Sequence, residues 1–141
     1  MANRNAVFID TSGWIAVLNA DDALYEPACR QLVELGVERR PLITTDWVLA
    51  ETGNGLARTV ARAGFAGAVQ RFRGSSHCRL VHVNDELFDR ALNLYSQMED
   101  KSWGLVDCAS FVVMQEEGIL DAFTSDRHFA QAGFHCLFPT G

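Results

Sequence analysis

The chain has 141 residues, of which 48% are apolar, enough to bury the core of one folded domain. This composition excludes an intrinsically disordered chain. Twelve basic residues against 18 acidic ones give a formal charge of −6, which argues against a protein that holds nucleic acid through a generally basic surface. We expect a single domain over residues 1–141.

The charge is unevenly spread along the chain. Residues 52–80 contain no Asp or Glu but several arginines, which gives this stretch a formal charge of +5. These arginines are Arg58, Arg62, Arg71, Arg73 and Arg79. We therefore expect one face of the protein to be basic, although the whole is acidic.

The four cysteines show neither CxxC spacing nor a histidine at zinc-site spacing. We therefore expect reduced thiols rather than a zinc site or a disulfide framework. The N-terminus runs directly into an apolar strand-like segment, without the longer apolar region of a signal peptide. No apolar run approaches the roughly 18 residues of a membrane span, so we expect a cytoplasmic protein that does not bind a membrane.

Short apolar runs alternate with longer segments of helical period. This pattern is typical of an α/β fold with a mainly parallel central sheet of four to five strands flanked by helices. The predicted strands cover residues 6–10, 42–45, 79–83, 121–125 and 135–138. The predicted helices cover residues 12–18, 25–36, 46–62, 65–73, 85–98 and 106–117. Asn84 is a strong start for the helix at 85–98, because a capping side chain satisfies free backbone amides.

Four acidic residues lie where an apolar run gives way to a helix or turn. They are Asp10, Glu51, Asp107 and Asp126. In a parallel sheet, such positions present side chains to a ligand. Each acid also has an ordinary explanation, since Asp10 and Asp107 can cap the helices that follow them. Asp126 can likewise form an Asx-turn.

Glu51 is the acid that capping explains least. On a helix that starts near Thr45, it lies within about 60° of both Trp47 and Val48, so we expect it to point toward the core. Arg58, the nearest basic residue on that face, is roughly 10 Å away along the axis and too far for an ion pair. Because a core-facing carboxylate without a partner is costly, we expect Glu51 to be protonated or to meet a cation.

Convergence of the four carboxylates would create a divalent-cation site. Each pair at about 4 Å repels by about 4 kcal/mol at an effective dielectric constant of 20, and a divalent ion removes that cost. Oxygen ligands favour Mg²⁺ or Mn²⁺ over zinc. Such an ion can generate hydroxide and neutralise the charge on a leaving oxygen, which is the chemistry of phosphodiester cleavage.

Four segments, in order and at suitable spacing, resemble the PIN-domain ribonucleases. They are Phe8–Trp14, Asp46–Thr52, Trp103–Phe111 and Phe123–Phe129. The match that they define extends over nearly the whole chain, which looks most like the VapC-type toxins of bacterial toxin–antitoxin pairs. The resemblance implies an α/β sandwich around a parallel sheet and a Mg²⁺- or Mn²⁺-dependent endoribonuclease activity. It also implies homodimerisation and inhibition by a cognate antitoxin.

The same resemblance implies roles for individual residues. By motif position, the family's acidic quartet is Asp10, Glu51, Asp107 and Asp126. Asp10 and Asp107 would be direct metal ligands, and Ser12 would place a hydroxyl beside the metal or its water. Relatives commonly carry Ser three residues before the third acid, where this chain has Gly104. A hydroxyl often found near the site is therefore missing, and substrate positioning could differ.

Arg58 and Arg62 are candidates for RNA binding. They are one turn apart on the predicted helix 46–62, so they can face the same way and contact neighbouring phosphates beside the acidic pocket. Two alternatives remain open. The arginines could form an ordinary solvated helix face, or a surface that an acidic antitoxin segment covers.

Two residues next to the acids receive no catalytic role. His128 lies two residues after Asp126, but a metal-bound water needs no histidine base, so we expect a surface or packing role. Cys108 lies beside Asp107, and we expect it to pack in the core, because no histidine is positioned by motif to activate it.

The leading hypothesis is a metal-dependent endoribonuclease that acts as the toxic half of a toxin–antitoxin pair. One rival is a metal-dependent phosphohydrolase or receiver-like phosphoacceptor. A haloacid-dehalogenase-type enzyme needs a second Asp where Ser12 stands, and a receiver needs an acidic pair before Asp10 and a late strand-end Lys; neither pattern is met. The other rival is a catalytically inactive PIN-like module that binds RNA or protein, against which the intact quartet argues.

Overall fold

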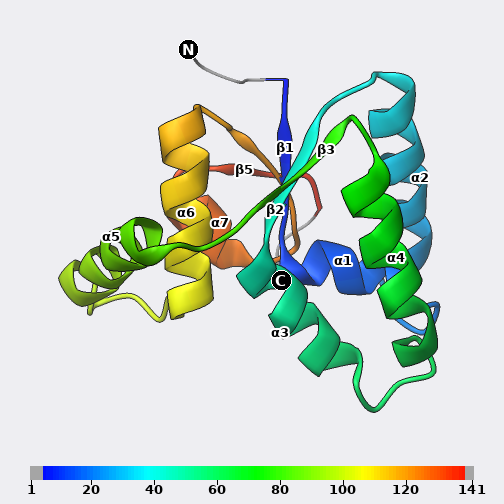
Figure 1. Ribbon diagram of the computed structural model, residues 1–141, viewed down its shortest axis with the longest axis horizontal. Helices are drawn as coiled ribbons and strands as arrows, with labels where there is room; N and C mark the ends of the chain where they lie inside the picture. The colour runs from blue at the N-terminus through cyan, green and yellow to red at the C-terminus, as the bar shows by residue number, and fades with distance from the viewer. Residues whose placement is uncertain (1–4, 139–141) are drawn as a thin grey trace.

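A five-stranded parallel sheet forms the centre of the molecule, for which a computed structural model describes residues 5–138 (Figure 1). The strands are β1 (Val7–Ile9), β2 (Leu42–Thr45), β3 (Cys78–Val81), β4 (Asp121–Phe123) and β5 (His135–Cys136). Their order is β3-β2-β1-β4-β5, and every pairing is parallel. The predicted α/β fold with a parallel sheet of four to five strands is confirmed.

Helices cover both faces of the sheet. They are α1 (Thr11–Leu18), α2 (Tyr25–Val37), α3 (Asp46–Leu56), α4 (Arg62–Gly74), α5 (Asp85–Gln97), α6 (Leu105–Glu117) and α7 (Arg127–Gln131). In Figure 1, α5, α6 and α7 lie on one side of the sheet, and α1, α2 and α4 lie on the other. The predicted start of α5 is correct, because the Asn84 side chain accepts a hydrogen bond from the Leu87 amide at 2.9 Å.

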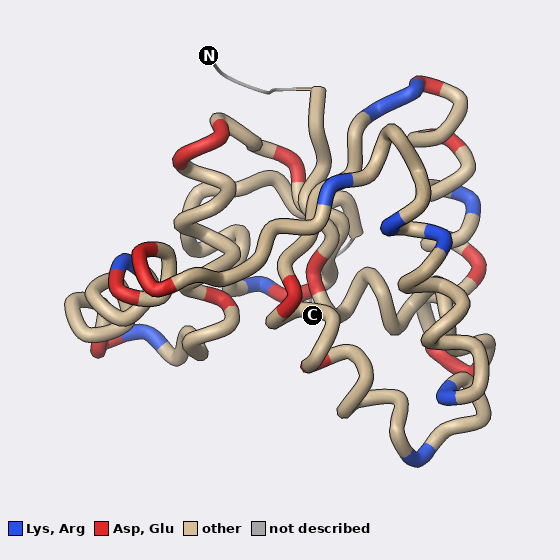
Figure 2. The backbone as a smooth tube through the Cα atoms, in the orientation of Figure 1, with Lys and Arg blue, Asp and Glu red and all other residues tan. Residues whose placement is uncertain are grey.

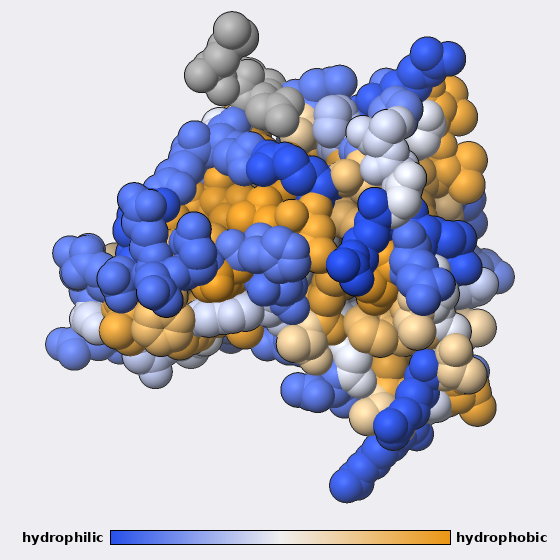
Figure 3. All heavy atoms as spheres, in the orientation of Figure 1, coloured by the Kyte–Doolittle hydropathy of each residue, from blue (hydrophilic) through white to orange (hydrophobic). Residues whose placement is uncertain are grey.

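The central strand explains the apolar run at the start of the chain. Val7, Phe8 and Ile9 are all buried, because helices cover both faces of β1 and neither face meets water. Their neighbours on the α6 side are aromatic: Phe8 packs near Phe129, whose ring meets Phe111 edge-on at 4.9 Å. In Figure 3, apolar side chains are visible mainly between α6 and the sheet, inside a hydrophilic rim.

The register of the sheet brings distant segments together. Ile9 of β1 is paired with Phe123 of β4, so Asp10 and Thr124 follow at the same edge, the carboxyl edge of the sheet. The Asp10 amide donates to the Phe123 carbonyl at 3.3 Å, which extends this pairing by one step. The carboxyl edge of a parallel sheet is where ligands of open α/β folds commonly bind.

The predicted helix 46–62 is wrong beyond residue 56. Helix α3 ends at Leu56, and α4 begins at Arg62 rather than at the predicted residue 65. Thr59 explains why α3 ends there. Its amide and its hydroxyl both donate to the Leu56 carbonyl oxygen at 2.9 Å, so this oxygen is occupied and does not accept the hydrogen bond that would continue the helix. Its hydroxyl then accepts the Ala61 amide and shapes the turn into α4.

Further differences separate the observed elements from the predicted ones, and strands β1, β3 and β4 end one or two residues before their predicted ends. Helix α7 was not predicted, because five residues give little more than one turn and too little periodicity to detect. Strand β5 ends at Cys136 rather than at residue 138. The predicted domain also includes residues 1–4 and 139–141, which lie outside the described residues. Between residues 5 and 138, the structure has no helix with the length and apolarity that crossing a membrane would require.

Candidate active site

Asp10 ends β1 and points into a network of hydroxyl groups. Its side chain is 3% exposed, and Oδ2 accepts hydrogen bonds from Thr124 Oγ1 at 2.9 Å and from Ser12 Oγ at 3.3 Å. Asp10 stands at the N-cap position of α1, yet its side chain makes no capping hydrogen bond. The capping explanation for Asp10 is therefore wrong, and its carboxylate is held across the ends of β1 and β4 instead.

Ser12 ties the same two strand ends together. Its hydroxyl lies 2.9 Å from Thr124 Oγ1 and accepts the Ser125 amide at 3.0 Å. Thr124 in turn accepts the Asp126 amide at 3.0 Å. A chain of short hydrogen bonds thus leads from Asp10 to Asp126 and fixes how the two residues stand relative to each other.

Asp107 and Asp126 do cap helices, but each uses only one oxygen to do so. Asp107, in the first turn of α6, accepts the Gly104 amide through Oδ2 at 3.3 Å. Asp126, at the N-cap of α7, accepts the His128 amide through Oδ1 at 2.9 Å. Among residues 5–138, no donor occupies Asp107 Oδ1 or Asp126 Oδ2. Capping and ligand binding are therefore compatible at both residues.

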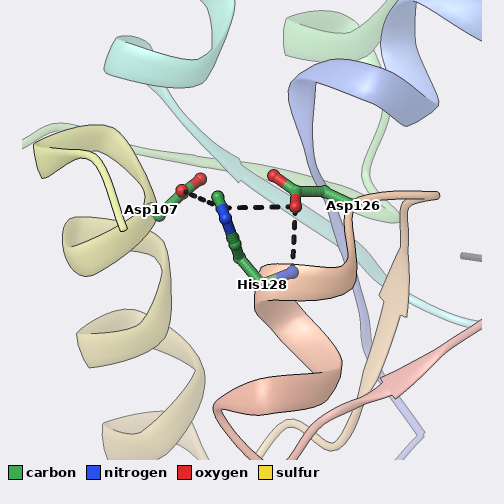
Figure 4. A group of neighbouring side chains, drawn as sticks. All are labelled: Asp107, Asp126 and His128. Carbon is green, nitrogen blue, oxygen red and sulfur yellow. Dashed lines mark hydrogen bonds and ion pairs between the residues drawn. The ribbon is translucent and has the colours of Figure 1, made fainter. Parts of the chain in front are cut away.

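His128 lies between these two carboxylates, as Figure 4 shows. Its Nδ1 is 3.1 Å from Asp107 Oδ2 and 3.3 Å from Asp126 Oδ1, and its Nε2 is 3.1 Å from Ser102 Oγ. One ligand atom from each of Asp107, Asp126 and His128 lies within 4.8 Å of the others, close enough to hold a metal ion. The expected surface or packing role for His128 is thus wrong, since the imidazole faces the acids.

Sequence alone gave little warning of this arrangement. Asp126 caps the short helix α7, and His128 is the second residue of that helix. Side chains in a helix tilt toward its N-terminus, so the His128 side chain points back toward Asp126. The spacing of Asp126 and His128 becomes informative only once α7 is known to begin between them.

The expectation that Glu51 points into the core is wrong. Glu51 is exposed, and its Oε1 accepts a hydrogen bond from Thr11 Oγ1 at 2.5 Å. The buried residues of α3 are Val48, Leu49, Thr52 and Leu56. At about 100° per residue, their centre lies about 115° from Glu51. Trp47 misled the prediction, because at the same spacing it lies about 155° from that centre, on the other side of α3, where it packs edge-on against Phe88 of α5.

Glu51 consequently stands at the edge of the acidic group rather than within it. Its hydroxyl partner Thr11 lies between Asp10 and Ser12 in the chain, so Glu51 is one residue removed from the Asp10 network. Asp10, Asp107 and Asp126 are the acids whose charges act on one another most directly.

Burial and mutual repulsion disfavour the charged forms of these acids. Burial raises the pKa of Asp10 from 3.8 to about 7; the hydrogen bond from Thr124 opposes this shift, and the charges of Asp107 and Asp126 add to it. Burial, followed by the charge of Asp126, also raises the pKa of Asp107. A divalent cation among the three would offset both effects.

The residues present fit a hard divalent cation. The carboxylate oxygens of Asp107 and Asp126 and one imidazole nitrogen form the candidate ligand group, which includes no thiolate. The carboxylates suit a hard divalent cation, and an imidazole nitrogen also serves first-row divalent metals, so the group fits a divalent metal ion. Cys108 is fully buried, and burial raises its pKa to about 11, so its assignment to packing rather than to nucleophilic catalysis holds.

Arg58 and Arg62 do not share a helix as predicted. Arg58 lies in the turn after α3, and Arg62 is the first residue of α4. Both are exposed, and Arg62 donates through Nη1 to the Ala57 carbonyl at 3.1 Å. Figure 2 shows that the chain around this turn carries basic residues and no acidic ones. The two arginines still lie near each other, but a turn rather than one helix face sets their spacing.

Comparisons with known proteins agree with this fold. The PIN-domain family model matches residues 7–135, and the chain therefore belongs to the PIN-domain family. It is 35% identical over 130 residues to the 23S rRNA-specific endonuclease VapC20 from two strains of Mycobacterium tuberculosis, CDC 1551/Oshkosh and H37Rv. This match covers 91% of the chain and 95% of each relative.

Solved structures show the same architecture. The crystal structure of M. tuberculosis VapC20, described as a sarcin-ricin loop cleaving toxin, superimposes with a TM-score of 0.81 at 31% identity. That match covers 92% of this chain and 96% of the other. FitAcB from Neisseria gonorrhoeae matches with a TM-score of 0.63 over 94% and 97% of the two chains. At 16% identity, this second match shows the fold alone.

Proposed function

We propose that this protein is a metal-dependent endoribonuclease and the toxin of a type II toxin–antitoxin pair. The observation that carries the proposal is the cluster of Asp107, Asp126 and His128 at the carboxyl edge of the sheet, to which Thr124 joins the buried Asp10. The similarity to a 23S rRNA-specific endonuclease over nearly the whole chain supports an RNA substrate.

In this proposal, Asp10, Asp107 and Asp126 hold Mg²⁺ or Mn²⁺. A bound ion of this kind supplies positive charge for the phosphate and lowers the pKa of water. Ser12 and Thr124 fix the Asp10 carboxylate, and His128 holds Asp107 and Asp126 through Nδ1. Glu51, exposed beside Thr11, would act at the margin of the site as the fourth acid.

The proposed substrate is 23S rRNA, because the relative with 35% identity acts on that RNA. With such a substrate, we propose that the protein acts in the cytoplasm, where ribosomes are found. The resemblance to VapC-type toxins supports a cognate antitoxin and a homodimer as partners. We also propose that residues 1–141 form one domain, since the family match extends from residue 7 to residue 135.

The test is incubation of the purified protein with ribosomal RNA in Mg²⁺, in Mn²⁺ or with a chelator. We expect discrete cuts in 23S rRNA with metal and none with chelator. Asp10→Asn and Asp107→Asn should each reduce the cutting rate at least about 100-fold, since each removes a charged metal ligand. Asp89→Asn, which changes an exposed acid on α5, is the matched control and should cut normally.

Cutting that persists in both variants and in chelator would overturn the metal-dependent mechanism. Metal binding without any cutting would favour the inactive interaction module. Calorimetry with Mn²⁺ separates these outcomes, because it measures ion binding without requiring catalysis.

A further inference from the structure

A polar pocket of about 380 Å³ lies beside the acidic site and is not used by the proposed metal chemistry. It is lined by Tyr95, Glu99, Lys101, Ser102, Trp103 and Gly104, which come from the end of α5 and the loop between α5 and α6. Its volume falls in the range of roughly 300–1,000 Å³ that is usual for small-ligand sites.

The pocket is joined directly to the candidate active site. Ser102, on its wall, lies 3.1 Å through Oγ from Nε2 of His128. Gly104, also on its wall, donates its amide to Asp107 at 3.3 Å. A group bound in this pocket would therefore lie next to whatever Asp107 and His128 bind.

The loop that carries the pocket is held in place. Trp103 is 8% exposed, and its Nε1 donates to Gln131 Oε1 of α7 at 3.0 Å. Its ring packs edge-on against Phe111 of α6 at 4.9 Å. The Lys101 amide closes a turn onto the Met98 carbonyl at 2.9 Å. A site that is already shaped loses less entropy when it binds a ligand.

The charges on the wall fit a base better than a phosphate. Glu99 is acidic and would repel phosphate, as would its chain neighbour Asp100, which does not line the pocket. Lys101 lines the pocket and offers one cation, with its Nζ 3.6 Å from Asp100 Oδ2. Tyr95 is 49% exposed and supplies an aromatic ring, on which unpaired RNA bases commonly stack. A neutral base could donate hydrogen bonds to Glu99, accept one from Lys101 and stack on the ring of Tyr95.

We propose that this pocket binds an unpaired guanine next to the cleaved phosphodiester. This inference rests on the proposed endoribonuclease function. The N1–H and N2–H₂ groups of guanine are adjacent donors that suit the two oxygens of Glu99, and its O6 and N7 are acceptors that suit Lys101. Adenine and uracil lack this pair of adjacent donors, and cytosine provides only one donor group.

The binding test uses short RNAs in chelator, so that no cleavage occurs. The probes are seven-nucleotide oligoadenylates with a central guanosine, inosine, cytidine or adenosine, and anisotropy measures their affinity. We expect guanosine to bind about tenfold more tightly than inosine, which lacks the N2 amino group, and than the other bases. Equal affinity for all four probes would overturn the proposal.

Two pairs of variants locate the effect. Glu99→Gln should reduce the preference for guanosine to about twofold, whereas Asp100→Asn, which removes the same charge from the same loop, should keep it. Tyr95→Ala should weaken all probes about tenfold through lost stacking, and Tyr95→Phe should restore binding. An equal loss of preference in Glu99→Gln and Asp100→Asn would show a general charge effect and reject the guanine pocket.

Mapping the cut ends in 23S rRNA separates this proposal from the function on which it rests. If the protein cuts with metal and guanosine flanks the cuts, both stand. If it cuts without any preference for a flanking guanosine, the pocket proposal fails while the endoribonuclease proposal survives. If it selects guanosine in chelator but never cuts, the guanine pocket stands and the endoribonuclease proposal fails.

Discussion

Asp10 is buried near two other acids, and this position determines how it responds to pH. Its carboxylate has lost most of its water, and Thr124 and Ser12 replace only part of that hydration. The resulting pKa of about 7, against 3.8 in an unfolded chain, means that the folded protein binds this proton more tightly. The contribution of Asp10 to the free energy of unfolding is then greatest below about pH 4, decreases as the pH rises from 4 to 7, and levels off above 7.

We predict that the metal-free protein loses up to about 4 kcal/mol of this contribution between pH 4 and pH 8. Asp10→Asn should remove most of the slope, because an amide does not titrate, whereas the exposed-site control Asp89→Asn should retain it. Urea unfolding in chelator at several pH values measures the effect. Identical slopes in wild type and Asp10→Asn would show that Asp10 does not titrate in this range.

Helix α1 approaches β4 so closely that only glycine fits at the contact. A Cβ on Gly13 would lie 2.1 Å from the Phe123 carbonyl oxygen and 2.6 Å from Phe123 Cδ2. The Phe123 backbone cannot move aside as a flexible side chain can, so a larger residue at position 13 would displace α1 from the sheet. Because Asp10 and Ser12 stand at the start of α1, the same contact positions the acidic site.

We therefore predict that Gly13→Ala lowers the free energy of unfolding by about 2–3 kcal/mol. The matched control is Gly64→Ala in α4, where a Cβ meets nothing within 4 Å. That change should raise the free energy of unfolding by about 0.5–1 kcal/mol, because alanine favours a helix over glycine. Denaturant titration compares the two variants, and a Gly13→Ala protein as stable as wild type would contradict the close contact.

At the scale of the whole molecule, charge is separated rather than balanced. The chain is acidic overall, yet the α3–α4 turn and α4 carry arginines and no acids. Arg79 and Arg90 are neutralised by Glu117 and Glu116, whereas no carboxylate among the described residues pairs with Arg58 or Arg62. A basic segment of this kind can hold RNA phosphates although the net charge of the protein is negative.

We predict that Arg58→Gln/Arg62→Gln weakens RNA binding and lowers the slope of log affinity against log salt by about 1.4, the value expected for two phosphate contacts in single strands. Arg79→Gln/Arg90→Gln removes two paired charges and should leave the slope nearly unchanged. RNA affinity measured in chelator from 50 to 300 mM KCl, a roughly sixfold range of salt concentration, gives the slope for each double variant. An unaltered slope in the Arg58→Gln/Arg62→Gln variant would show that these arginines do not contact RNA and face solvent or the antitoxin instead.

The sequence by itself determined the parallel sheet and the approximate places of three of the four acids. Continuous apolar runs such as Val7–Ile9 are favourable only where both faces of a strand are covered, so they indicate a buried parallel sheet. The acids that follow β1 and β4, and Asp107 in the first turn of α6, met at one edge as expected. Local chemistry also determined the start of α5 at Asn84.

Only the tertiary structure decided the end of α3, the existence of α7, the exposure of Glu51 and the position of His128. Periodicity reveals where apolar residues lie on a helix, but not which neighbour each one meets: Trp47 packs against Phe88 of α5, away from the side of α3 that faces the core. His128 meets Asp107 because α6 and α7 lie side by side, although the residues are 21 positions apart in the chain. Contacts between distant segments arise from packing, which no local pattern of residues encodes.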